Sequence, residues 1–206
     1  MLKILGRASS INVQKAMWCA AELGINVERE DIGGKFGGND TPEYLAKNPN
    51  GLVPTMEDGD LILWESQAIV RYLCEREGRT PWYPGDLKGR GLANQWMDWY
   101  LTRLHPPMTV IFWGLIRTEP QDRDLDAMEK AAGQAAEYWR LVDTHLENTP
   151  FIIGDEPSMG DIPLGCSVNR WFTLDVERPA LPRLEAYYQC LQERPHYREH
   201  VMVKME

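Results

Sequence analysis

Two pairs of polar residues stand directly before helical sequence patterns, where a folded chain could bind an anion. Ser9 and Ser10 precede a segment whose apolar residues recur at i, i+3, i+4 and i+7. Glu65 and Ser66 end a strand-like run and enter a second helical segment. A helix begins with unpaired N–H groups and about half a positive charge, which stabilise a carboxylate there. Simple helix capping is the alternative role for these hydroxyls, and one residue can do both.

The stretch NPNGLVPTMEDGDLILWES, residues 48–66, places a proline inside strand-like sequence. Asp58-Gly59 is a strong two-residue turn signal, so a β-hairpin is expected here. Proline cannot donate to a sheet and therefore marks an edge, a strand start or a bulge. A cis Val53-Pro54 bond would hold the Val53 backbone groups out toward a ligand, whereas a trans proline on an edge strand would serve structure alone.

The elements that would position these residues fall into two parts. The patterns over residues 1–78 are, in order, strand, helix, strand, helix, strand, strand and helix, which is typical of a compact α/β domain with its own sheet. Residues 79–88 are rich in Gly and Pro and are expected to form a linker. From residue 89 to 206 the patterns are helical throughout. We therefore expect an α/β domain followed by an all-helical domain.

Two features stand out in the helical part. A helix is expected to start near Leu92 and to be interrupted at Pro106-Pro107, because proline lacks a backbone donor and disrupts a helix interior. Ser158 and Asp161 have the spacing of a capping box, in which the Asp161 carboxylate would accept from the Ser158 N–H at the start of another helix.

The composition excludes several classes of partner. The 206 residues carry 22 Lys and Arg against 31 Asp and Glu, which gives a net charge of -9. Nucleic acids and anionic membranes are bound by basic surfaces, so neither is an expected partner. No apolar stretch approaches the roughly 20 residues of a membrane helix, and the N-terminus lacks the apolar run of a signal peptide. A cytoplasmic location is therefore expected.

The cysteines and histidines show no spacing that would hold a metal. The four cysteines are scattered without a Cys-x-x-Cys pair, which argues against zinc fingers and redox pairs and favours free buried thiols. The four histidines stand in polar surroundings and are expected at the surface. No metal cofactor is expected. The residues concerned are Cys19, Cys74, Cys166 and Cys190, and His105, His145, His196 and His200.

Taken together, these features resemble the cytosolic glutathione S-transferases over essentially the whole chain. The most specific motifs are Leu52-Val53-Pro54, Glu65-Ser66 and the Ser158–Asp161 box. The resemblance implies an N-terminal thioredoxin-like domain, with a mixed four-stranded sheet, that binds glutathione. It also implies a C-terminal helical-bundle domain that lines the pocket for a hydrophobic electrophile, and a homodimer as the assembled form.

The resemblance also implies roles for the hairpin residues. In this family the proline is cis, so Pro54 would be cis, and the Val53 backbone N–H and C=O would pair with the cysteinyl part of glutathione. Glu65 would accept from the γ-glutamyl ammonium. Ser66 and the N–H groups of the helix that follows would bind the γ-glutamyl carboxylate.

The catalytic turn has two candidate hydroxyls. A free cysteinyl thiol has a pKa near 8.5, so lowering it by about two units requires roughly 2.7 kcal/mol of selective thiolate stabilisation. Serine-using theta, delta and zeta enzymes suggest Ser9 as the donor to the sulfur. The bacterial nu-type pattern suggests Ser10, with the Asn12 amide as a second donor, and we favour this alignment. A capping role alone for both serines is the alternative.

The second pocket and the reaction are less specified by the sequence. Plausible lining residues are Met108, Phe112, Trp113 and Trp171, each of which could equally be core. The expected function is glutathione transfer to a hydrophobic electrophile, or glutathione-dependent reduction of peroxides or disulfides. The alternatives are a glutathione-dependent isomerase or dehalogenase, and a non-catalytic interaction module like elongation factor 1 gamma or stringent starvation protein A.

Overall fold

The computed structural model describes residues 1–78 and 80–206. Residue 79, the first of the expected linker, lies outside the described residues. The α/β part contains, in chain order, β1 (Leu2–Leu5), α1 (Ile11–Glu22), β2 (Val27–Glu30), the 3-10 turn η1 (Gly34–Phe36), α2 (Pro42–Leu45), β3 (Thr55–Asp58), β4 (Leu61–Trp64) and α3 (Ser66–Glu77). The helical part contains α4 (Leu87–Trp99), the π-helical segment η2 (Tyr100–Leu104), α5 (His105–Phe112), the π-helical segment η3 (Trp113–Arg117), the 3-10 turn η4 (Pro120–Asp122), α6 (Leu125–His145), α7 (Asp161–Thr173), α8 (Pro182–Gln192) and α9 (Pro195–His200).

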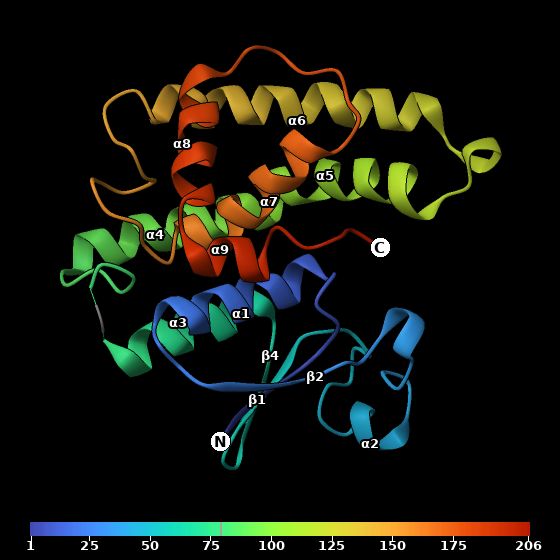
Figure 1. The fold of residues 1–206 in the computed structure, drawn as a ribbon, viewed down its shortest axis with the longest axis vertical. Helices are drawn as coiled ribbons and strands as arrows, with labels where there is room; N and C mark the ends of the chain where they lie inside the picture. The colour runs from blue at the N-terminus through green and yellow to red at the C-terminus, as the bar shows by residue number, and fades with distance from the viewer. Residues whose placement is uncertain (79) are drawn as a thin grey trace.

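The α/β part is built on a mixed four-stranded sheet, as the resemblance implied. The strand order is β2-β1-β3-β4, with β1 parallel to β2 and antiparallel to β3, and β3 antiparallel to β4. Met56 in β3 stands opposite Ile4 in β1, and neither side chain has any exposed surface. Figure 1 shows α1 and α3 between this sheet and the helical part. The sheet therefore packs one face against the two helices that start at the candidate anion sites.

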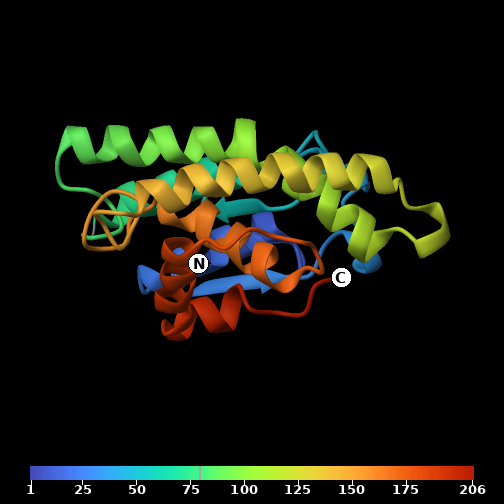
Figure 2. The ribbon, with the colours of Figure 1, turned by 90° about the horizontal axis from the view of Figure 1, so that it is seen from above.

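The helical part is organised around α7. Every residue from Asp161 to Trp171 is buried, and α7 packs against α1, α4, α5 and α8. Seen from above, α8 and α9 lie on the opposite side of α6 from α4 (Figure 2). A helix buried on all sides is the centre of the core, so α7 is the element against which the other helices are positioned.

Contacts of α1 with α7 and α9 join the two parts into one body. Gly165 in α7 lies under the Trp18 ring, and a Cβ at that position would come within 2.7 Å of the indole. Arg194 donates two hydrogen bonds, of 2.8 and 2.6 Å, to the Glu22 carboxylate, which also accepts from the Trp18 indole. A paired Arg–carboxylate contact has a fixed geometry, so it fixes how α1 sits on the helical part.

The first helix of the helical part begins earlier than the sequence predicted. The expected linker extends to residue 88, but α4 starts at Leu87. The Asp86 side chain accepts a hydrogen bond of 2.7 Å from the Gly89 N–H and so caps the helix. Aspartate at this position satisfies one of the unpaired donors of a helix start, which explains why the helix begins inside the Gly- and Pro-rich stretch.

The interruption predicted at Pro106-Pro107 is a change of helix type and not a break: regular α-helix ends at Trp99, and a π-helical segment separates it from α5. The chain runs from α4 through the π-helical segment η2 into α5 without leaving helical backbone angles at Trp99, Tyr100 or His105. The prolines occupy the first positions of α5, where an N–H is not needed, and the wider turn of η2 precedes them. As a result, α4, η2, α5 and η3 form one long rod.

The structure also bears on two expectations from the sequence, for the cysteines and for membrane-spanning helices. Cys19, Cys74 and Cys166 are buried free thiols, as expected, whereas Cys190 is exposed. Across residues 1–78 and 80–206, no helix combines the length and the apolar character that a bilayer crossing requires.

Candidate active site

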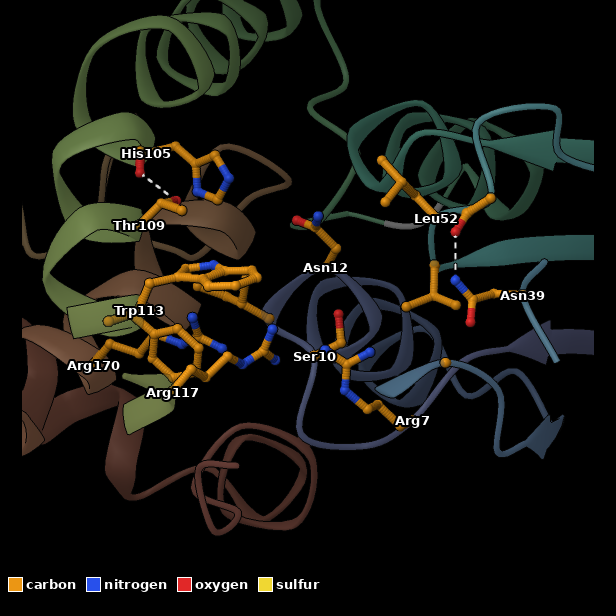
Figure 3. Close-up of a pocket in the computed structure, with 15 residues that line it drawn as sticks. Arg7, Ser10, Asn12, Asn39, Leu52, His105, Thr109, Trp113, Arg117 and Arg170 are labelled. Atoms are coloured by element: carbon orange, nitrogen blue, oxygen red, sulfur yellow. Dashed lines mark hydrogen bonds between the residues drawn. The ribbon is translucent and has the colours of Figure 1, made fainter. Parts of the chain in front are cut away.

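A cavity of about 350 Å³ lies where the α/β part meets the rod of α5 and η3 (Figure 3). Its α/β wall comes from the turn before α1, the glycine-rich loop and the segment before β3. Its helical wall comes from α5, η3 and α7. The lining residues are Arg7, Ser10, Ile11, Asn12, Gly33, Asn39, Gly51, Leu52, Val53, His105, Thr109, Phe112, Trp113, Arg117 and Arg170.

The two candidate serines occupy different positions at the start of α1. Ser10 is the residue directly before the helix and lines the cavity, and its hydroxyl does not cap the helix. Ser9 is buried, does not line the cavity, and its hydroxyl has no hydrogen-bond partner among the described residues. The hydroxyl that faces the cavity beside the helix N-terminus is therefore that of Ser10.

Asn12 is held with its amide oxygen turned away from a ligand. The Asn12 Oδ1 accepts a hydrogen bond of 2.9 Å from Lys15 Nζ and one of 3.3 Å from Ser66 Oγ. Both lone pairs of the oxygen are thereby used. The Nδ2 group makes no hydrogen bond to the described residues, and Asn12 lines the cavity. The side chain can therefore donate to an acceptor placed beside Ser10.

A second, smaller cavity of about 40 Å³ continues from the first. The two share Asn12, Leu52 and Val53, and the smaller one is also lined by Pro54, Glu65, Ser66, Asn48, Asn50 and Trp64. The Val53-Pro54 bond is cis, as predicted. The two cavities therefore adjoin along a line from the start of α3, past the cis bond, to the start of α1, and together they are called the trough.

The backbone at the start of α3 is turned by an unusual conformation at Glu65. Glu65 has a φ of 72°, the left-handed region that non-glycine residues rarely occupy, and Ser66 is the first residue of α3. A non-glycine residue in this conformation lowers the stability of the fold by on the order of 1 kcal/mol, so it occurs where the surrounding structure enforces it. The exposed Glu65 carboxylate and the unpaired N–H groups of α3 consequently lie at the same end of the trough.

The helical wall comes from one face of the rod. His105, Thr109, Phe112 and Trp113 recur at i, i+4, i+7 and i+8 and all line the cavity. Phe112 and Trp113 were among the four pocket residues expected from the sequence. Trp113 is 52% exposed, so much of its ring is open to the solvent.

The other two expected pocket residues lie elsewhere, in the core. Met108 is buried and does not line the cavity, because its position on α5 points into the bundle. Trp171 is fully buried on α7, with its ring centroid 6.3 Å from that of Trp139. Neither residue can form a wall for a co-substrate in this cavity.

The cavity also contains charged and titratable residues that the sequence analysis did not single out. His105 was expected at the surface, but it is half-buried in the cavity wall, with Nδ1 3.0 Å from the Tyr100 hydroxyl. Burial, with the nearby charges of Lys15 and Arg170, lowers the pKa of His105 to about 3, so its ring is uncharged at neutral pH. The spacing of His105 to Phe112 on a helix was the only sequence signal that could have placed it here.

Three arginines complete the lining, and they come from segments far apart in the sequence. Arg7 precedes α1, Arg117 ends η3, and Arg170 lies in α7. Burial lowers the pKa of Arg170 to about 10 and also lowers the pKa of Arg117, and both stay protonated at neutral pH. No local motif could reveal this group, because only the fold brings it together. Among the described residues, no group of acidic, histidine or cysteine side chains could hold a metal ion.

Comparisons with known proteins agree with this architecture. Residues 1–75 match the family model of the glutathione S-transferase N-terminal domain, and residues 123–190 match that of the C-terminal domain. Glutathione S-transferase GstB of Escherichia coli strain K12 is 37% identical over 205 residues, which cover 98% of this chain and 99% of that protein. Human glutathione S-transferase theta-2B is 29% identical over 149 residues, which are 69% of this chain and 60% of that protein.

A solved structure is similar over the full length. The theta class glutathione S-transferase from the citrus canker pathogen Xanthomonas axonopodis pv. citri, with glutathione bound, superimposes with a TM-score of 0.96 at 43% identity, covering 100% of this chain and 99% of that one. Both family domains, a full-length relative and this structure agree with the mixed sheet and helical bundle described above. The chain belongs to the glutathione S-transferase family.

Proposed function

We propose that this protein binds glutathione in the trough formed by the two connected cavities and activates its thiol at the start of α1. The reaction that we propose is conjugation to an electrophile. The glutathione thiolate attacks an electrophilic carbon, the C–S bond forms, and the leaving group departs with its electron pair. The glutathione-bound structure of the Xanthomonas relative supports the choice of ligand.

The observation that carries the proposal is the position of Asn12. It lines both cavities, its amide oxygen is occupied by Lys15 and Ser66, and its Nδ2 hydrogens have no acceptor among residues 1–78 and 80–206. Ser10, two residues earlier, adds a hydroxyl that is not used in capping. A sulfur at this point would meet two side-chain donors and the positive end of α1, which together favour the thiolate over the thiol.

The rest of the trough offers matching groups for the other parts of glutathione. The Val53 N–H and C=O have no hydrogen-bond partner among the described residues, so they are free to pair with a cysteinyl backbone. Glu65 supplies an acceptor for the γ-glutamyl ammonium. The backbone N–H of Ser66 and the other N–H groups of the first turn of α3 supply donors for the γ-glutamyl carboxylate, while the Ser66 hydroxyl stays bonded to Asn12. The peptide would therefore lie with its sulfur near Ser10.

Two further expectations remain part of the proposal: a homodimer and a cytoplasmic location. The exposed apolar side chains Ile62 and Trp64 on the edge strand β4, and Leu92 on α4, support a dimer because such residues are usually covered in an assembly. Sedimentation equilibrium measures the mass directly. A monomer at micromolar concentration would contradict the dimer and would leave the glutathione site untouched.

The proposal is tested by titrating the thiol of bound glutathione. Thiolate absorbs in the ultraviolet, so its pKa can be read for the wild-type protein, Ser10→Ala and Ser9→Ala. Ser10→Ala should raise this pKa and lower turnover, with little change in glutathione affinity, because the donor acts mainly on the charged form. Ser9→Ala is the matched control and should do much less. If Ser9→Ala moves the titration and Ser10→Ala does not, the assignment of the donor is wrong.

The same variants decide which chemistry follows activation. Parallel assays with an aryl halide, an organic peroxide and hydroxyethyl disulfide compare conjugation with reduction by glutathione. Conjugation predicts that Ser10→Ala slows turnover of the aryl halide. Turnover of the peroxide or the disulfide alone would replace the conjugation proposal by a reductase function at the same site.

A further inference from the structure

The wall of the cavity that faces the incoming co-substrate is electropositive. The sequence predicted an apolar wall, and Phe112 and Trp113 are indeed there, but a guanidinium group lies over each ring. Arg170 lies 3.8 Å from the centre of the Phe112 ring, and Arg117 lies 4.9 Å from the Trp113 ring and 5.2 Å from the Phe112 ring. A guanidinium stacked on an aromatic ring is held flat, and those of its N–H groups that have no other acceptor can face a ligand.

Arg170 is a buried cation with unused donor capacity. It is only 7% exposed, its Nη2 donates a weak 3.4 Å hydrogen bond to the Ser9 carbonyl, and its Nε has no partner in the described part of the chain. A buried charged donor that is left unpaired destabilises the fold, so such groups usually meet a ligand or an ion. The Arg170 side chain lines the cavity.

Arg117 and Arg7 bring two more positive charges to the same space. The Arg117 Nε and Nη2 donate to the main-chain oxygen of Glu206, at 3.3 and 3.2 Å. The Glu206 side-chain carboxylate pairs with Lys35, and the charge of Arg7 also helps to lower the pKa of that carboxylate. Arg7 runs along the glycine-rich loop. A Cβ at Gly34 would come within 3.0 Å of its side chain, so that glycine keeps a path open for Arg7 to reach the cavity.

These charges are not balanced by carboxylates within the cavity. None of the residues that line it in the described chain is acidic, and Arg7, Arg117 and Arg170 form no ion pair with a described Asp or Glu side chain. Elsewhere Arg29, Arg71 and Arg194 each have a carboxylate partner. Like charges in a partly desolvated site repel, and an anion that enters between them is attracted by all three.

Glutathione itself does not account for all three arginines. In the proposed binding mode its γ-glutamyl carboxylate lies at the start of α3, and its glycyl carboxylate would be nearest to Arg7 on the α/β wall. Arg117 and Arg170 belong to the helical wall (Figure 3). That wall faces the space left for the second substrate.

We propose that the co-substrate of this protein is an electrophile that carries a carboxylate, and that Arg117 and Arg170 bind this carboxylate while the reacting carbon faces Ser10. This inference rests on the proposed function and specifies its substrate class. Guanidinium groups bind carboxylates through two parallel N–H···O bonds, which would orient the molecule as well as attract it. The protein would accordingly prefer an anionic electrophile over a neutral one of the same shape and reactivity.

The test compares two benzylic bromides of nearly equal size, 4-(bromomethyl)benzoate and 4-(bromomethyl)benzamide. In both, the thiolate attacks the methylene carbon, the C–S bond forms, the C–Br bond breaks, and bromide leaves with the electron pair. The quantity measured is the ratio of kcat/KM for the benzoate to that for the benzamide. We expect the wild-type ratio to exceed the ratio of the uncatalysed rates by about tenfold or more, as one charge-assisted contact would give.

Variants assign the preference to the arginines. Arg117→Met should lower the benzoate-to-benzamide ratio about tenfold, and Arg117→Lys should restore part of it because the charge remains. Arg140→Met is the matched control, since Arg140 lies on α6, pairs with Glu137 and does not line the cavity. An unchanged ratio in Arg117→Met, or an equal loss in Arg140→Met, would overturn the proposal.

A binding measurement separates this inference from the proposed function. Calorimetric titration with 4-methylbenzoate, which cannot react, should show binding that 4-methylbenzamide lacks, and Arg170→Met should abolish it in a sample whose near-ultraviolet circular dichroism shows a folded protein. If conjugation fails but this binding is seen, the proposed function falls and the anion site stands. If Arg117→Met instead weakens glutathione binding and leaves the benzoate preference intact, the arginines serve glutathione and the inference is wrong.

Discussion

Lys15 Nζ lies 2.9 Å from Asn12 Oδ1, and this hydrogen bond joins the buried core of α1 to the cavity. Lys15 has no exposed surface, and its ammonium lies 4.5 Å from the centre of the Tyr100 ring. Asn12 is three residues away, at the first turn of the same helix, and lines both cavities. The buried Lys15 amino group, which donates this bond whether or not it is protonated, therefore fixes which end of the Asn12 amide faces a ligand.

The first prediction tests this orientation. Asn12→Asp keeps the oxygen that accepts from Lys15 and Ser66 but replaces the free Nδ2 donor by a second carboxylate oxygen. The pKa of bound glutathione should rise by about one unit or more, because a donor to the thiolate becomes a negative charge beside it. Thiolate absorbance against pH measures it. An unchanged pKa would mean that the Asn12 amide does not reach the sulfur.

The second prediction concerns Lys15 and the pH dependence of stability. Burial lowers the pKa of Lys15 from its ordinary value of 10.5 to about 7. Between pH 7 and 10.5 the unfolded state binds more protons than the folded state, so the free energy of unfolding rises with pH. The stability that Lys15 contributes in this way is fully present above the unfolded pKa of 10.5. It is lost as the pH falls through the folded pKa of about 7. Lys15→Met should flatten this rise.

The measurement is urea unfolding between about pH 7 and 8.5, below the ordinary pKa of thiols and phenols. The readout is the difference in slope between the wild-type protein and Lys15→Met. Lys88→Met is the control, because Lys88 is exposed at the start of α4. Equal slopes in all three proteins would show that Lys15 does not titrate in this range when folded.

The third prediction concerns the capping box at α7, whose backbone hydrogen bond is confirmed by the structure. Asp161 Oδ2 accepts from the Ser158 N–H at 2.8 Å and from the Ser158 hydroxyl at 3.0 Å, while Oδ1 accepts from the Ile152 N–H at 3.0 Å and the Tyr187 hydroxyl at 3.1 Å. Asp161→Asn would place amide hydrogens against donors. It should therefore cost about 3 kcal/mol or more of the free energy of unfolding, beyond the range of a lost cap.

A matched control is available at the start of α6. Asp124 is exposed and its side chain accepts only from the Ala127 N–H, at 2.9 Å. Asp124→Asn should cost no more than the usual effect of a cap. Denaturant unfolding of both variants decides the matter, and equal losses would show that the additional contacts of Asp161 contribute nothing.

Local signals predicted much of the fold and part of the site. The hairpin and the helix that begins after Ser10 depend on neighbouring residues, so the sequence shows them directly, although the two turn residues are Gly59 and Asp60, one position later than predicted. The cis bond at Pro54 was left open by the local sequence and was implied by the family resemblance. The start of α7 at Asp161 was marked in the same way. The short α9 was not anticipated, because its six residues provide too little periodicity.

Features that depend on tertiary contacts were missed. Arg7 and Arg170 line one cavity although they are 163 positions apart in the sequence, and nothing near either residue indicates this. The prediction that Trp171 lines the pocket was wrong for a related reason, since Trp171 is buried in the core. An aromatic residue has the same spacing along a helix whether its face packs into the core or lines a cavity. The π-helical segment Tyr100–Leu104 was also missed, because helix propensity does not distinguish a π-helical turn from an α-helical one.

The last prediction concerns the γ-glutamyl end of glutathione. Glu65 has its carboxylate at the small cavity, and we propose that it accepts from the γ-glutamyl ammonium. N-acetylglutathione lacks that charge, so a double-mutant cycle isolates the contact. Glu65→Gln should weaken glutathione binding about tenfold, as expected for a charge-assisted hydrogen bond, but should change N-acetylglutathione binding much less. Glu28→Gln, on the exposed face of β2, is the control and should affect neither ligand. Calorimetry gives the four affinities of the cycle. Equal losses for both ligands would mean that Glu65 shapes the backbone at the start of α3, where its φ is 72°, without pairing with the ammonium.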